Sequence, residues 1–130
     1  MDKAQPKDYR VVRESRKHRS LALRAAREAS RVLPFFEQDR PKDERPRLAI
    51  EALRLWAQGK VELGMAPVRQ LAQGAHAAAR AAKTDVAKFA ARAAGQAIAV
   101  WHVPNHVLGV KYYVKKVSVA NKKSGLKTRN

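Results

Sequence analysis

Apolar side chains recur every three or four positions between His18 and Phe36, which is the spacing of one face of an α-helix. This spacing predicts a helix from about Ser15 toward Pro34. Proline has no amide hydrogen and its ring crowds the preceding turn, so Pro34 should kink or end the helix. The apolar stripe consists of Ala22, Ala25, Ala26, Ala29, Val32, Leu33 and Phe36.

A second helix is expected after the polar stretch "EQDRPKDERP". Asp43 can cap its first turn, and Pro46 is tolerated there because the first amides of a helix have no intrahelical partner. Gly59 provides the C-terminal stop. The apolar face of this helix is Ala49, Ala52, Leu53 and Trp56.

A third, alanine-rich helix is predicted from about Ala66 to Ala82. Alanine-rich faces allow helix axes to approach closely. The positions expected to face inward are Val68, Leu71, Ala72, Ala75 and Ala79.

The last helical segment begins at Asp85, where Thr84 can cap it, and runs to roughly Val117. Glycine and proline interrupt its pattern, which predicts either two helices or one helix kinked near Pro104. A strand over "VKYYVKKVSV" is the less favoured alternative. The interruptions fall at Gly95, Pro104 and Gly109.

A chain of 130 residues has room for one hydrophobic core. We therefore predict an all-α fold, a single domain of four or five helices over residues 15–118 with a Pro-kinked C-terminal helix. Residues 1–14 and 119–130 show no sustained apolar period and are rich in lysine and arginine. They are interpreted as a basic N-terminal arm and a flexible basic C-terminal tail.

Charge changes the picture, because 28 basic residues stand against 11 acidic ones and give a net charge of +17. Such an excess attracts polyanions. The chain has no cysteine, which excludes disulfides, zinc–thiolate sites and cysteine nucleophiles. No apolar run reaches the roughly 20 residues needed to span a bilayer, and the first residues lack the apolar stretch of a signal peptide. We expect a cytoplasmic protein without membrane contact.

Basic side chains also form a ridge on the first predicted helix, opposite the apolar stripe. A phosphate backbone meeting such a ridge releases condensed counterions, giving affinity that does not depend on sequence and falls with salt. A solvated arginine-rich face is the simpler alternative. Trp56 is expected in the core, and Tyr112 and Tyr113 in an apolar segment, so base-specific reading is not supported. The polyanion-binding candidates are Arg13, Lys17, Arg24, Arg27, Arg31, Lys115, Lys116, Lys122, Lys123, Lys127 and Arg129.

The stretch "WHVPNH" places His102 and His106 on either side of Pro104. Because Pro104 cannot donate to the carbonyl of Val100, a histidine N–H can satisfy that acceptor, and we interpret the segment as a structural joint. The joint comprises His76, His102, Pro104 and His106. A metal site is the rival interpretation, since histidines at i and i+4 can share an ion and His76 could add a third ligand. It lacks the glutamate of an HExxH motif, so we predict no metal and no cofactor.

Acids gather only between the first two predicted helices, where Asp39, Asp43 and Glu44 lie among four basic residues. Ion pairing and helix capping explain them, because carboxylates that exchange protons in catalysis need an apolar pocket to separate their pKa values. There is no phosphate-gripping glycine loop and no GxSxG elbow. We predict that the chain is not an enzyme.

Four stretches occur in an order that resembles a known family: "HRSLALRAAREASRVLPFFE", "DERPRLAIEALRLWAQGK", "GAHAAARAA" and "ARAAGQAIAVWHVPNHVLGVKYY". Over about residues 17–117 the chain is similar to the immunity-5-like proteins of bacterial polymorphic toxin systems. The resemblance implies a helical domain that binds and neutralises a partner toxin without turnover, and it carries over no catalytic residue. Arg24, Arg27, Glu28 and the basic ends depart from the family pattern and make this chain more cationic.

Two functions follow as hypotheses. The first is a non-enzymatic binding protein that occupies the surface of a partner, with a toxin as the implied partner. The second is a cationic protein associated with RNA or DNA, for example at the ribosome or nucleoid, that uses the ridge and the basic ends.

Overall fold

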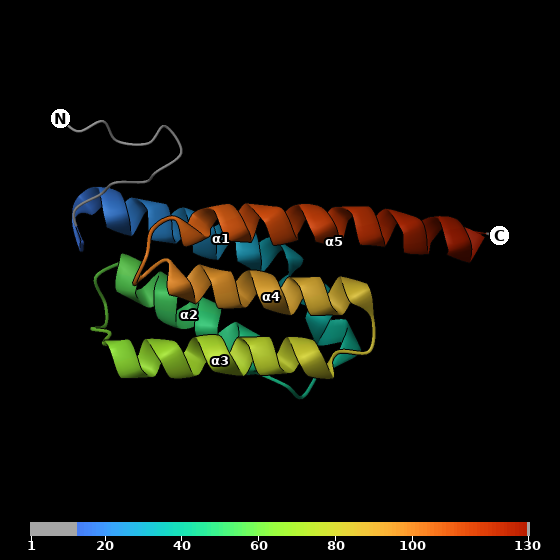
Figure 1. The fold of residues 1–130 in the computed structure, drawn as a ribbon, viewed down its shortest axis with the longest axis horizontal. Helices are drawn as coiled ribbons and strands as arrows, with labels where there is room; N and C mark the ends of the chain where they lie inside the picture. Colours follow the sequence, from blue (N-terminus) through green and yellow to red (C-terminus); the bar gives the residue numbers. More distant parts are fainter. Residues whose placement is uncertain (1–12, 130) are drawn as a thin grey trace.

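Five helices form the structure, a computed structural model that describes the backbone of residues 13–129 and the side chains of residues 13–123. They are α1 (Arg16–Asp39), α2 (Arg45–Ala57), α3 (Met65–Ala81), α4 (Asp85–Ala99) and α5 (His106–Arg129). Successive helices run in opposite directions, so α1 and α5 run the same way along one side of the bundle (Figure 1). No strand occurs within residues 13–129, and the segment that alternates weakly lies inside α5. The predicted all-α single domain is confirmed.

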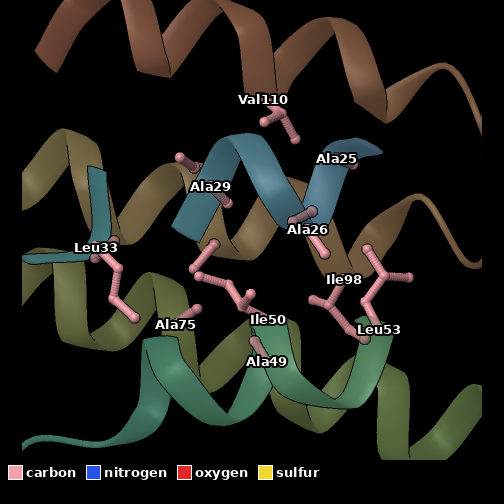
Figure 2. Packing of buried hydrophobic residues seen from close by; sticks show 14 of the residues in the cluster. Ala25, Ala26, Ala29, Leu33, Ala49, Ile50, Leu53, Ala75, Ile98 and Val110 are labelled. Carbon is pink, nitrogen blue, oxygen red and sulfur yellow. The ribbon is translucent and has the colours of Figure 1, made fainter. Parts of the chain in front are cut away.

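Helix α4 is the centre of the bundle, because it packs against all four other helices. Its side chains are small on nearly every side, which lets the neighbouring axes come close and leaves each partner an apolar surface. Its buried residues are Ala87, Ala90, Ala91, Ala93, Ala94, Gly95, Ala97 and Ile98. Figure 2 shows the core that results, with Ala25, Ala26, Ala29 and Leu33 of α1, Ala49, Ile50 and Leu53 of α2, Ala75 of α3, Ile98 of α4 and Val110 of α5.

Helix α1 starts where predicted but does not stop at Pro34. The Ser15 side chain accepts a hydrogen bond from the His18 amide at 3.1 Å and caps the first turn. The helix continues five residues past Pro34 to Asp39. Both Pro34 and Ser30, whose carbonyl loses its donor, are exposed, so water can replace the missing bond. Burial of Phe36 beyond the proline keeps the last turn on the core.

The ends of α2 differ from the prediction at the start and agree at the finish. Its N-cap is Glu44, not Asp43, although Asp43 Oδ1 accepts from the Arg45 amide at 3.1 Å and so still satisfies a first-turn donor. Gly59 adopts a φ of 77°, and its amide donates to the carbonyl of Trp56 at 2.9 Å. Because Lys60 also donates back to Leu55, the helix ends in a Schellman motif, as expected for a glycine stop.

The helical segment is interrupted between α4 and α5, so the C-terminal helix is not kinked at Pro104. Of the two alternatives the structure has the first, two separate helices, with Pro104 in the turn between Val100 and Asn105. The expected cap at the start of α4 is confirmed, since Thr84 accepts from the Ala87 amide at 3.1 Å. The two glycines that the pattern marked as interruptions lie inside helices.

The C-terminal segment is helical where a flexible tail was expected. Helix α5 continues to Arg129 and extends past the ends of the other helices (Figure 1). One physical effect explains the error. Lysine and alanine have good helix propensity, so they propagate a helix that is already nucleated. The predicted N-terminal arm lies outside the described residues, apart from residues 13 and 14.

Candidate functional site

Of the three acids predicted to form ion pairs or caps here, Asp43 pairs with an arginine, Asp39 binds a backbone amide, and Glu44 is the N-cap of α2 without a side-chain cap bond. Arg45 reaches both carboxylate oxygens of Asp43, at 2.9 and 2.7 Å, and this hydrogen bonding lowers the pKa of Asp43. Arg47 makes the same bidentate pair with Glu37, with both distances 2.7 Å. Asp39 accepts from the Lys83 amide at 2.8 Å and ties α1 to the α3–α4 connection. These groups act in structure, and the arginines among them are already neutralised.

The ridge on α1 has a different character. Lys17, Arg24, Arg27 and Arg31 are all exposed on one face, and none forms an ion pair with another described residue. We call these four residues the α1 ridge. Three of them, Lys17, Arg24 and Arg27, border a shallow groove of about 730 Å³. Its other lining residues are Arg16, Ser20, Leu21 and Leu23. A row of free cations on a helix is a surface that an anionic partner can use.

Arg13 was predicted on this ridge and is not part of it. It precedes α1, and its guanidinium lies 4.5 Å from the ring centroid of Trp101. It also donates to the carbonyl of Trp101 at 3.5 Å. The error arose because the helical spacing was extended backward beyond the Ser15 cap.

A histidine that the sequence analysis did not single out makes the joint between α1 and the α4–α5 turn. His18 is fully buried and donates from Nε2 to the carbonyl of Val100 at 2.8 Å. Its Nδ1 accepts from the Glu14 amide at 2.9 Å, so both ring nitrogens are used, and the ring meets Trp56 edge-on with centroids 4.9 Å apart. The guanidinium of Arg19 lies over the same Trp56 ring, 4.3 Å from the ring centroid. We call this cluster the His18 joint.

At the His18 joint a histidine has the predicted role, but it is not one of the histidines for which that role was predicted. The carbonyl of Val100 was expected to need a histidine N–H, and it has one, but from α1 rather than from the "WHVPNH" segment. One signal was available in the sequence, because His18 lies four positions before Ala22 on the apolar stripe of α1. A histidine on a helix face that packs into the core is expected to be buried and to have hydrogen-bond partners.

The other three histidines do not form a single joint. His76 accepts from Arg92 at 2.8 Å and lies against Gly95, and His106 donates to Gln96 Oε1 at 2.9 Å. Burial lowers the pKa of both His76 and His106, and Arg92 lowers the pKa of His76 further. His102 is exposed, so its expected packing role is wrong. It shares only a small groove of about 240 Å³ with His106 beside the start of α3.

The two glycines that the sequence marked as interruptions permit close approach, because side chains of other residues occupy the space that a Cβ would fill. A Cβ at Gly95 would lie 2.5 Å from Nε2 of His76. A Cβ at Gly109 would overlap with Oε1 of Gln96. The rival metal site is not found, because residues 13–129 contain no group of three or more histidines or acids able to hold an ion.

Helix α5 carries the other predicted cations, and with Phe89 of α4 it forms an aromatic floor that the sequence did not indicate. Lys115, Lys116 and Lys123 line a groove of about 500 Å³ with Phe89 and Tyr112. We call this the α5 groove, and its remaining residues are Asp85, Val119 and Ala120. Tyr112 is 56% exposed rather than part of an apolar interior. Lys122 is exposed as well, whereas the side chains of Lys127 and Arg129 lie outside the described part.

Within the described part of the chain, no helix combines the length and apolar character needed to cross a bilayer.

Comparison with known proteins adds one finding to this geometry. Neither the curated proteins nor the solved structures contain a significant match to the chain. A family model described as "Imm-5 like putative immunity protein" matches residues 12–130, which include all five helices, the His18 joint and both cationic faces. The chain therefore belongs to the Imm-5 like immunity protein family.

Proposed function

We propose that the chain is a non-enzymatic immunity protein that neutralises a toxin by occupying part of its surface. Family membership supports the immunity role, and the distribution of charge supports the mode of action. Arg45 and Arg47 of α2 are paired with acids, whereas the α1 ridge has no acidic partner among the described residues.

One observation carries the proposed mode of action: four exposed cations stand on one helix face with no described counter-ion. Complementary charge across an interface accelerates encounter and selects the partner. The toxin surface that this chain covers should therefore be acidic. Inhibitors of basic nucleases, by contrast, are expected to be acidic.

Co-expression tests this function. The toxin encoded beside the gene of this chain is induced in a bacterial host with and without the chain, and growth is followed. Protection by the wild-type chain, together with a stable complex in size-exclusion chromatography, is the expected result. Undiminished toxicity in the presence of folded chain would contradict the proposal.

A second candidate is contact with RNA or DNA, and one observation favours it. No acidic residue occurs after Asp85, while nine basic residues do. A salt series of fluorescence anisotropy with labelled RNA and duplex DNA tests this candidate, because binding through phosphates weakens steeply as salt rises. Absence of binding near physiological salt would remove it.

A further inference from the structure

Helix α5 has an inner row and an outer row with different chemistry. Val107, Val110 and Val117 are fully buried and attach the helix to the bundle. The outer row, spaced by four, three and four positions, is Leu108, Tyr112, Lys115 and Val119. Residues at this spacing share one face of a helix. Three of the four are large apolar side chains with exposed fractions of 41, 56 and 47%.

The α5 groove adjoins this row and gives it a fixed aromatic floor. Phe89 of α4 stacks on Tyr113 with centroids 6.2 Å apart, and Tyr113 meets Tyr112 edge-on at 5.0 Å. The ammonium of Lys116 lies 5.4 Å from the Phe89 ring and 5.7 Å from the Tyr112 ring. Because these rings hold one another, a partner that packs on Tyr112 orders few additional side chains.

Charge limits what can occupy this face. The described side chains of α5 include five lysines and no acid. The single acid that borders the groove, Asp85, lies in the first turn of α4, where the helix dipole stabilises a negative charge. An occupant with its own carboxylates would be attracted to the lysines, and one with basic side chains would be repelled.

The apolar outer row favours a protein segment over a nucleic acid. Leu108 and Val119 offer aliphatic surface, which matches apolar side chains and gives nothing to a phosphate. The Lys116 ammonium also lies over the aromatic faces on which bases would stack. From Leu108 to Val119 the row extends about 16 Å at 1.5 Å per residue, the length of about three helical turns.

We propose that the outer face of α5 docks an acidic amphipathic segment of a partner protein, with Tyr112 as its apolar anchor and Lys115 and Lys123 as its charge contacts. This inference rests on the proposed function and adds to the α1 ridge a second contact surface for the partner. Aromatic side chains that lie among apolar residues, with charged residues at the edge of the interface, commonly dominate the binding energy at protein interfaces.

The direct test uses a defined probe, a labelled 16-residue peptide with leucine and tryptophan at i, i+4 spacing and glutamate elsewhere. Fluorescence anisotropy gives its affinity for the full chain. Tyr112→Ala should weaken binding about tenfold or more. Leu48→Ala is the matched control, since Leu48 is 50% exposed on α2, a helix without contact to α5, and it should leave the affinity unchanged.

Charge is tested with a second pair of variants. Lys115→Glu/Lys123→Glu should abolish peptide binding, whereas Arg24→Glu/Arg31→Glu makes the same charge change on α1 and should have a smaller effect. All four positions are exposed, so the variants keep the fold, which far-ultraviolet circular dichroism checks. Equal losses in both charge pairs with no effect of Tyr112→Ala would overturn the proposal. So would binding of a single-stranded oligothymidylate at this face in preference to the peptide.

Failure of this inference can be separated from failure of the proposed function. If the wild type and Tyr112→Ala/Lys115→Glu protect equally against the toxin, the immunity function stands and α5 is not its site. If the wild type gives no protection, the proposed function is wrong whatever the peptide does. Protection by the wild type that is lost in the α5 variant and kept in Leu48→Ala supports both.

Discussion

The arginines of α2 and those along the α1 ridge are the same residue type in opposite situations. Arg45, Arg47 and Arg54 each pair with a carboxylate of the same chain. Arg24, Arg27 and Arg31 have no such partner among the described residues. The difference shows that net charge alone does not locate a binding surface, because part of it is neutralised within the fold.

The histidines divide in the same way. His18 is buried with both ring nitrogens bonded, whereas His102, in the turn between α4 and α5, is exposed. Polar groups that are satisfied inside the fold should therefore respond to substitution through stability. Those that face solvent should respond through binding.

The largest expected effect is on stability and comes from substituting the buried histidine, whose ring nitrogens are both hydrogen-bonded. His18→Ala leaves the Val100 carbonyl and the Glu14 amide without their partners and removes a ring packed on Trp56. The free energy of unfolding should fall by about 3 kcal/mol. Urea denaturation measures it, with His102→Ala as the control, expected to change stability by less than about 0.5 kcal/mol. Equal losses in the two variants would refute the contrast.

The next prediction compares the two sets of arginines directly. Arg24→Gln/Arg27→Gln/Arg31→Gln should weaken binding of duplex DNA about tenfold and reduce the slope of log affinity against log salt by about 2 to 3, if the ridge contacts phosphates. The fold should be unaffected. Arg45→Gln/Arg47→Gln/Arg54→Gln removes the same charge from paired positions and should weaken binding less. The two triple variants binding equally would show that only net charge matters.

A smaller effect sharpens the view of the interior. Gly95→Ala places a methyl group on the His76 ring and should destabilise the protein by about 1 kcal/mol, despite the better helix propensity of alanine. In a His76→Ala background the obstruction is gone, and the same Gly95→Ala change should stabilise by up to about 1 kcal/mol. Thermal denaturation of the four proteins measures this reversal of sign. The same sign in both backgrounds would mean that His76 does not restrict position 95.

The smallest expected effect is a dependence on pH. Burial lowers the pKa of His76 and His106 in the folded protein, so the unfolded chain binds more protons as pH falls below about 6.5. The melting temperature should be highest above pH 7 and should drop between pH 6.5 and 5. His76→Gln/His106→Gln should flatten this part of the curve. A profile unchanged by the double substitution would assign the drop to general charge repulsion instead.

Local patterns predicted those features of the fold that depend on local chemistry. The bounds of α3 agree within one residue, and Thr84 and Gly59 act as the expected cap and stop. Of the two outcomes predicted at Pro34, the end of the helix is wrong, because it depends on whether the carbonyl of Ser30 can reach water, which is a tertiary property. The extent of α5 was missed because periodicity disappears where a helix no longer packs on the bundle.

The candidate site was less predictable, since it depends on which residues of distant segments meet. The free cations of the α1 ridge followed from helical spacing, except at Arg13, where the helix had not begun. The aromatic floor of the α5 groove joins Phe89 to Tyr112, and no sequence spacing brings these two residues together. The partner of Val100 was foreseen as a type of residue but not as His18, for the same reason.

The division of α5 into two rows has a consequence for how relatives of this protein can diverge. The inner valines fix the helix to α1 and α4, while the outer row contributes little to that attachment. Substitutions in the outer row can therefore accumulate without loss of the fold. On the docking face proposed for α5, a few substitutions on a single helix would exchange one partner for another without changing the stability of the fold.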